Sequence, residues 1–126
     1  MKQSLKKWED NILEDLLIET LKTLNFPVRL QGSLLPNEPY PDHFFTFWNN
    51  DSYGDSFYDN DEQSTVYSYQ VNFYSIDPDM VYTKLREAKR ALKNVGFIIS
   101  GDGYSVMSDE NTHDGRGMTV LYLRRN

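Results

Sequence analysis

Residues 63–96 read QSTVYSYQVNFYSIDPDMVYTKLREAKRALKNVG, and this stretch decides the fold class because a strand pattern is followed directly by a helix pattern. Its first half alternates large apolar with small polar side chains: Tyr67, Ser68, Tyr69, Gln70, Val71, Asn72 and Phe73. A period of two is typical of a strand with one face buried. We therefore expect a strand over Gln63–Ser75, half buried, with its serine and amide side chains on the other face.

The second half of the stretch carries the signals of a helix. Asp77 is suited to cap it, Pro78 fits the first helical position, and Gly96 fits the left-handed residue just past its end. Apolar residues recur at spacings of four and three: Val81, Leu85, Ala88, Leu92 and Val95. This spacing predicts a helix with one apolar face.

The flanking segments supply the other elements. Residues 4–24 repeat apolar side chains at helical spacing, with Ser4 as the expected cap. Strands are expected at Val28–Leu30, His43–Asn49 and Met118–Arg125, the last after a polar loop at 108–117. Gly101-Asp102-Gly103 predicts a tight hairpin between residues 97–100 and 104–107. Together these elements predict one α+β domain over residues 1–126, with two helices on a mainly antiparallel sheet of about four to five strands.

Composition limits the classes of protein to which the chain can belong. With 126 residues, 39% hydrophobic and 14% aromatic, it suffices for one buried core. The absence of cysteine excludes disulfides, thiolate catalysis and thiolate zinc sites. No segment approaches the roughly 18 apolar residues of a membrane-spanning helix, so we expect no membrane contact.

Charge is unevenly distributed around a net value of −6. Residues 31–83 contain no Lys or Arg, and five of their carboxylates lie in a segment, 50–62, that we expect to project as an acidic loop. Four of these five are the candidate acidic interface residues: Asp51, Asp55, Asp59 and Asp61. The basic residues concentrate on the second predicted helix: Lys84, Arg86, Lys89, Arg90 and Lys93. These groups are either an ordinary solvated helix face and an unrelated loop, or two surfaces that meet between copies in a head-to-tail contact.

No catalytic or ligand-binding motif is visible. His43 and His113 belong to no nucleophilic signature, and His113 with Asp114 is expected in a surface loop. Gly101-Asp102-Gly103 lacks the following helix of a phosphate-binding loop. The carboxylates of 51–62 do not follow the ligand order of a calcium loop. We expect no metal, no cofactor and no enzymatic activity.

The order of parts resembles a family of phage proteins. The phrases that carry the resemblance are PDHFFTFWN at 41–49, an acidic insert, YQVNFYS at 69–75 and LKNVGF at 92–97, between an amphipathic first helix and a last strand. This arrangement is similar to the tail-terminator, tail-completion and head–tail joining proteins of long-tailed phages that infect Gram-positive bacteria. The similarity covers nearly the whole chain.

The resemblance implies a structural role and no reaction. Members of that family form homo-oligomeric rings, commonly hexamers, at the end of the tail tube, and contact the tube protein and the head connector. The expected location is the virion tail, after assembly in the host bacterial cytoplasm. An acidic loop lining the ring would repel DNA, and net negative charge disfavours sequence-specific nucleic-acid binding.

Three other functions can be weighed from the residues alone. A small acidic binding module, such as an immunity or inhibitor protein, would dock a basic target as a monomer. A pocket enzyme would need a buried Asp or Glu among apolar strand positions, and none is visible in Gln63–Ser75 or Met118–Arg125. A stacking platform for single-stranded nucleic acid on Tyr67, Tyr69 and Phe73 is less favoured than core packing, because the surrounding segment is acidic.

Overall fold

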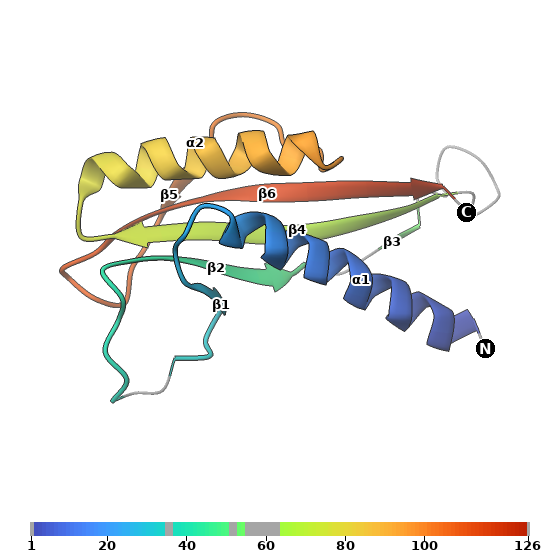
Figure 1. Ribbon diagram of the computed structural model, residues 1–126, viewed down its shortest axis with the longest axis horizontal. Coiled ribbons are helices and arrows are strands. Elements are labelled where there is room, and N and C mark those ends of the chain that lie inside the picture. Colours follow the sequence, from blue (N-terminus) through green and yellow to red (C-terminus); the bar gives the residue numbers. More distant parts are fainter. Residues whose placement is uncertain (1, 35–36, 51–52, 55–63, 126) are drawn as a thin grey trace.

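The computed structural model describes residues 2–34, 37–50, 53–54 and 64–125, with side chains described for 12–34, 37–50 and 65–124 (Figure 1). The elements in chain order are α1 (Lys2–Lys22), β1 (Val28–Leu30), β2 (His43–Asn49), β3 (Tyr53–Gly54), β4 (Ser64–Ser75), α2 (Pro78–Asn94), β5 (Tyr104–Val106) and β6 (Asp114–Arg125). The predicted α+β class is confirmed. The strands at 28–30 and 43–49 lie where the sequence predicts them.

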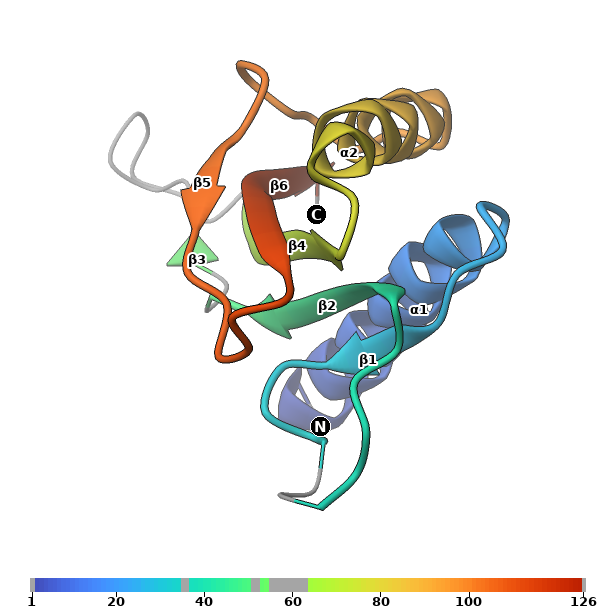
Figure 2. The same cartoon turned by 90° about the vertical axis from the view of Figure 1, so that its left-hand side faces the viewer.

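The strands form one six-stranded sheet in the order β1-β2-β4-β6-β5, with β3 paired to β4 beyond the end of β2. The β1–β2 pair is parallel, and the other pairs are antiparallel. Both helices lie against the same face of the sheet (Figures 1 and 2). No described helix covers the other face, which we call the open face.

The core lies between the two helices and the sheet. It is built from apolar residues of α1 and α2 and from one face of the central strands: Leu13, Leu17, Leu21, Val81, Leu85, Ala88, Leu92, Phe45, Phe47, Tyr67, Tyr69, Val71, Phe73, Met118 and Val120. Removal of this apolar surface from water is the main stabilising contribution. Tyr67, Tyr69 and Phe73, considered above as a stacking platform for nucleic acid, are buried in this core.

The predicted start of α2 is confirmed. The Asp77 side chain accepts a hydrogen bond of 3.0 Å from the Asp79 N–H, and Pro78 occupies the first turn. Gly96 has a φ of 107°, the left-handed value expected just past the helix. Val95, by contrast, is 39% exposed and not part of the buried face. The predicted cap of α1 is wrong, because the helix already begins at Lys2 and Ser4 lies inside it.

The open face of β4 is not half exposed as predicted. Ser68, Gln70 and Asn72 are only 7%, 6% and 2% exposed. Gln70 Nε2 donates to Asn72 Oδ1 over 2.9 Å, Asn72 Nδ2 donates to the Tyr74 hydroxyl over 3.1 Å, and the Tyr104 hydroxyl donates to Gln70 Oε1. The amide side chains thus satisfy one another while lying along the sheet.

The C-terminal part differs from the predicted hairpin. Ile98 bridges Leu121, and β5 pairs with Gly115–Gly117 of β6, so residues 98–106 follow a single edge of β6. Gly101-Asp102-Gly103 bulges from this edge and does not reverse the chain. In addition, β6 begins at Asp114 and not at Met118. Gly117 lies in this strand, paired with Asn72, and only glycine fits there because a Cβ would lie 2.1 Å from Asn72 Oδ1.

Candidate functional site

The basic residues predicted as an interface all lie on α2, but two of them have partners within the chain. Lys84 Nζ is 2.9 Å from Glu87 Oε2 and 5.9 Å from the centre of the Phe26 ring. Lys89 Nζ donates to the Gly101 carbonyl oxygen and is 3.6 Å from Asp102 Oδ1. These two cations hold neighbouring parts of the same molecule together.

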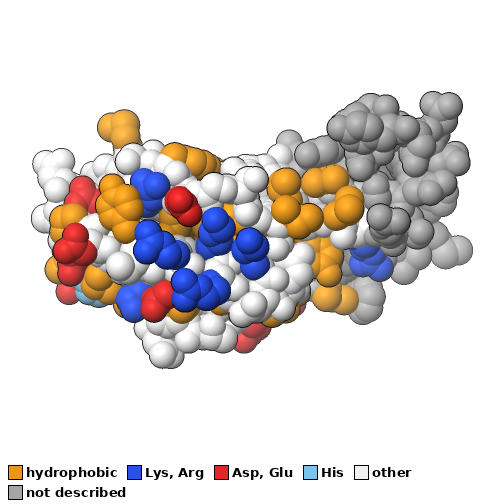
Figure 3. Space-filling view, turned by 90° about the horizontal axis from the view of Figure 1, so that it is seen from above, with side chains coloured by type: hydrophobic (Ala, Val, Ile, Leu, Met, Phe, Trp, Pro, Cys, Tyr) orange, Lys and Arg blue, Asp and Glu red, His pale blue; other side chains and the backbone are white. Residues whose placement is uncertain are grey.

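The other three basic residues form what we call the cationic row: Arg86, Arg90 and Lys93. All three are exposed, and their spacing of four and three residues places them on one side of α2. They make no ion pair with any residue that the structure describes. Figure 3 shows basic side chains gathered over α2. The cationic row is therefore available to another molecule.

The predicted acidic partners, Asp51, Asp55, Asp59 and Asp61, lie outside the described residues. The same holds for the carboxylates considered for calcium. Within the described part of the chain, no group of three or more His, Asp or Glu residues could hold a metal ion. No Asp or Glu whose side chain is described is buried. Among the helices described, none is long and apolar enough to cross a membrane.

Carboxylates gather at the end of the sheet where β4 ends and β2, β6 and α2 begin, the end that faces the viewer in Figure 2. Backbone contacts join the segments that carry them: the Ile76 N–H donates to the Asp42 carbonyl oxygen over 3.0 Å, and Asp114 pairs with Ser75. We call this group the acidic end: Glu38, Asp42, Asp77, Asp79, Asp109, Glu110 and Asp114. No contiguous motif predicts it, because its members come from three separate segments.

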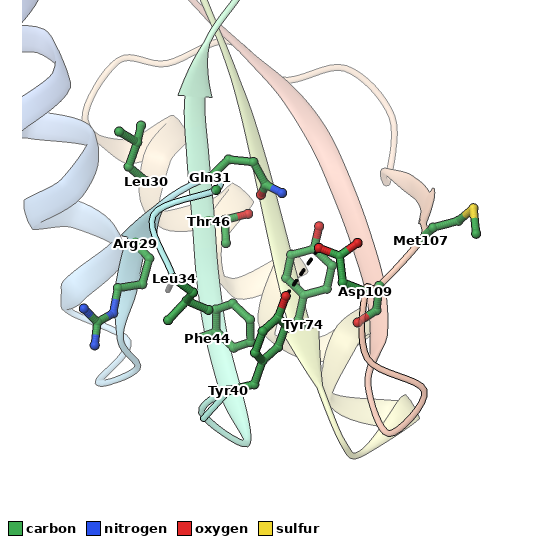
Figure 4. A pocket seen from close by; sticks show the side chains of 12 residues that line it. Arg29, Leu30, Gln31, Leu34, Tyr40, Phe44, Thr46, Tyr74, Met107 and Asp109 are labelled. Carbon is green, nitrogen blue, oxygen red and sulfur yellow. Dashed lines mark hydrogen bonds between the residues drawn. The ribbon is translucent and has the colours of Figure 1, made fainter. Parts of the chain in front are cut away.

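A hollow of about 290 Å³ opens on the open face beside the acidic end (Figure 4). Its aromatic lining is Tyr40, Phe44 and Tyr74. The Phe44 and Tyr74 rings stack with centres 5.3 Å apart, and Tyr40 meets Phe44 edge-on at 5.6 Å. The hollow therefore has a rigid apolar wall.

The hollow also has polar groups in its lining, a hydrogen-bonded pair and a hydroxyl without a described partner. The Tyr40 hydroxyl donates to Asp109 Oδ2 over 3.3 Å. Burial, together with the adjacent carboxylate of Asp109, raises the pKa of Tyr40, so the phenol keeps its proton and remains a donor. Thr46 also lines the hollow and is 5% exposed, yet its hydroxyl has no hydrogen-bond partner among the described residues.

His113 is buried, contrary to the prediction of a surface loop. Its Nε2 donates to the Pro41 carbonyl oxygen over 2.8 Å, and its Nδ1 lies 2.9 Å from Thr112 Oγ1. The imidazole ring also meets Tyr40 edge-on at 5.7 Å. His113 thus ties the loop that carries Asp109 to the segment that carries Tyr40. These contacts position the wall of the hollow.

Comparison of the chain with protein-family models and with curated proteins finds no match.

Proposed function

We propose that this protein is a phage tail-terminator or head–tail joining protein that forms a ring, of the hexameric kind common in the family it resembles, at the end of the tail tube. The observation that carries the proposal is the cationic row, whose three exposed cations lack ion-pair partners among the described residues of the same chain. A ring requires two different, complementary surfaces on each copy. The carboxylate-rich regions supply the opposite charge.

The layout of the core supports the same reading. The helices and the sheet bury their apolar faces against each other, and neither the cationic row nor the acidic end belongs to this apolar core. Complementary charges on the surface of such a body steer association and fix its orientation, and salt weakens them. The proposed partners are further copies of this chain, the tail tube protein and the head connector proteins.

Electron microscopy of tails assembled without this protein tests the role. We expect tails of abnormal length that fail to join heads. Complementation with Arg86→Glu/Arg90→Glu should fail to restore joining, whereas Lys22→Glu, an exposed cation on α1 outside the row, should restore it. Tails of normal length that join heads in the absence of the protein would contradict the proposal.

The acidic end also favours the second candidate, a small acidic module that docks a basic target protein. The two functions differ in the state of the protein itself. The docking module is a monomer at every concentration, with or without tails, and light scattering distinguishes it from a ring. A persistent monomer that is also dispensable for tail completion would favour the docking module.

A further inference from the structure

We infer that the hollow at the acidic end binds a basic side chain from the cationic row of a neighbouring copy, with Arg90 as its central residue. The inference rests on the proposed ring and names the surface that accepts the row. It assigns the contact to Asp109 and the aromatic wall, in place of the acidic segment 51–61 that the sequence suggested. Both surfaces are made of residues that the structure describes.

The lining of the hollow suits a guanidinium group. Planar guanidinium groups stack on aromatic rings and form paired hydrogen bonds with carboxylates. The hollow offers both, because the partly exposed ring of Tyr40 packs against the buried Phe44 ring and Asp109 lies at the rim. Arg29 lines it too, but Figure 4 shows the Arg29 guanidinium pointing away from Asp109.

Thr46 is a second, independent sign of an occupant. Its side chain is more than nine-tenths buried and lines the hollow, and no described residue bonds its hydroxyl. A buried polar group without a partner is unfavourable, so a ligand that brings a hydrogen-bond donor to the hollow is favoured. Arginine brings five such donors.

The placement of the two surfaces requires a second molecule. Thr46 and Asn72 pair across β2 and β4 on the open face, next to the Phe45–Phe73 pair of the core. The hollow therefore opens on the side of the sheet opposite to α2, which carries the cationic row and lies on the helix side of the sheet (Figure 2). Each copy thus presents one surface of each kind on opposite sides, the arrangement of a head-to-tail contact.

Disulfide trapping tests the inference, because the chain has no cysteine of its own. An Arg90→Cys chain is mixed at low salt with an Asp109→Cys chain of different tag, and the mixture is oxidised. We expect a cross-linked heterodimer in about tenfold higher yield than with Lys22→Cys in place of Arg90→Cys, the ratio set by one specific charged contact. All three positions are exposed, and the unfolding temperature of each variant verifies its fold.

The same experiment also tests the alternative contact, in which the cationic row meets the acidic segment 51–61. If Asp55→Cys cross-links to Arg90→Cys and Asp109→Cys does not, the hollow is not the acceptor, although the ring proposal survives. If neither cross-links above the Lys22→Cys level, the inference also fails, and the microscopy of tails decides the ring proposal separately.

A second measurement uses the unaltered chain. Carbodiimide coupling of a mixture of isotopically light and heavy protein should join Lys93 of one copy to Asp109 or Glu110 of another. Mixed-isotope peptides that join Lys93 only to carboxylates within 51–62 would overturn the inference.

Discussion

The two faces of β4 are both buried, but by different means. On the helix face, Tyr69 and Val71 lie beneath α1 and α2 in an apolar core. On the open face, Gln70 and Asn72 are buried with no described helix above them, because their amides bond one another and lie against Gly117 of β6. One face is closed by other elements, and the other is closed by its own side chains.

We therefore expect the helix face of β4 to determine the stability of the fold, and the open face to take part in contacts with other molecules. The helix face is completed within the molecule, because α1 and α2 cover it with apolar side chains. The open face keeps polar groups near its surface and ends in the hollow beside Asp109, where the Thr46 hydroxyl has no described partner. Substitutions should therefore have large effects on stability at the helix face and smaller ones, of either sign, at the open face.

The largest effect is expected from Leu85→Ala on the helix face. Leu85 is 1% exposed in the core, and truncation there removes apolar contacts and leaves a cavity. We expect a loss of about 2–5 kcal/mol in the free energy of unfolding, measured with urea. Lys93→Ala on the same helix is the control and should change it by less than about 0.5 kcal/mol. Equal effects would refute the assignment of the core.

Gly117→Ala should disrupt the contact between the Gln70 and Asn72 amides on the open face. The new Cβ would lie 2.1 Å from Asn72 Oδ1 and 2.7 Å from Gln70 Nε2, so the amides must move. We expect a loss of about 1–3 kcal/mol in unfolding free energy. The Gly117→Ala/Asn72→Ala double variant should cost less than the sum of the single changes, because the clash is shared. Strict additivity would contradict this account of the open face.

Tyr104→Phe should have a smaller effect. It removes the hydroxyl that donates to Gln70 Oε1, while Thr119 remains 3.4 Å from the same oxygen. We expect a loss of about 1 kcal/mol, typical of one hydrogen bond. A gain in unfolding free energy would show that the amides do not depend on Tyr104.

Thr46→Val should act in the opposite direction. It replaces a buried hydroxyl that has no described partner by a methyl group. The isolated protein should gain up to about 1 kcal/mol in unfolding free energy, measured by thermal and urea unfolding. Ser68→Val, on the same face, is the comparison, because Ser68 Oγ accepts from Asn50 Nδ2 over 3.4 Å and should gain less. A loss of stability in Thr46→Val would mean that the hydroxyl is bonded in solution.

The elements that the sequence predicts well are those with local signals. The Asp77-Pro78 start and the apolar spacing define α2, and the alternation around Val71 defines β4. The start of β6 was missed because Gly115 and Gly117 resemble turn residues locally. Both positions require glycine, because a side chain at Gly115 would clash with Tyr74 and one at Gly117 would clash with Asn72. Tyr74 and Asn72 lie on β4, which is distant in sequence.

The candidate site divides in the same way. The cationic row follows from the spacing of Arg86, Arg90 and Lys93 on one predicted helix. The acidic end does not, because its carboxylates come together only when the ends of several strands meet. His113 was placed at the surface for the same reason, since its partner at Pro41 is far away in the chain. A site formed by residues that are distant in sequence and close only in the fold cannot be predicted from local sequence patterns.

Sedimentation of charge-reversed chains tests the head-to-tail contact most directly. We expect Arg90→Asp and Asp109→Arg each to weaken self-association about tenfold at low salt, and the double variant to restore it, because the reversed charges again meet between copies. Because both side chains are exposed, the unfolding free energy of Arg90→Asp should stay within about 0.5 kcal/mol of the parent chain. That of Asp109→Arg should fall by no more than about 1 kcal/mol, because it also loses the hydrogen bond from Tyr40. Single reversals that assemble like the parent chain, or a double variant as defective as either single, would contradict the account.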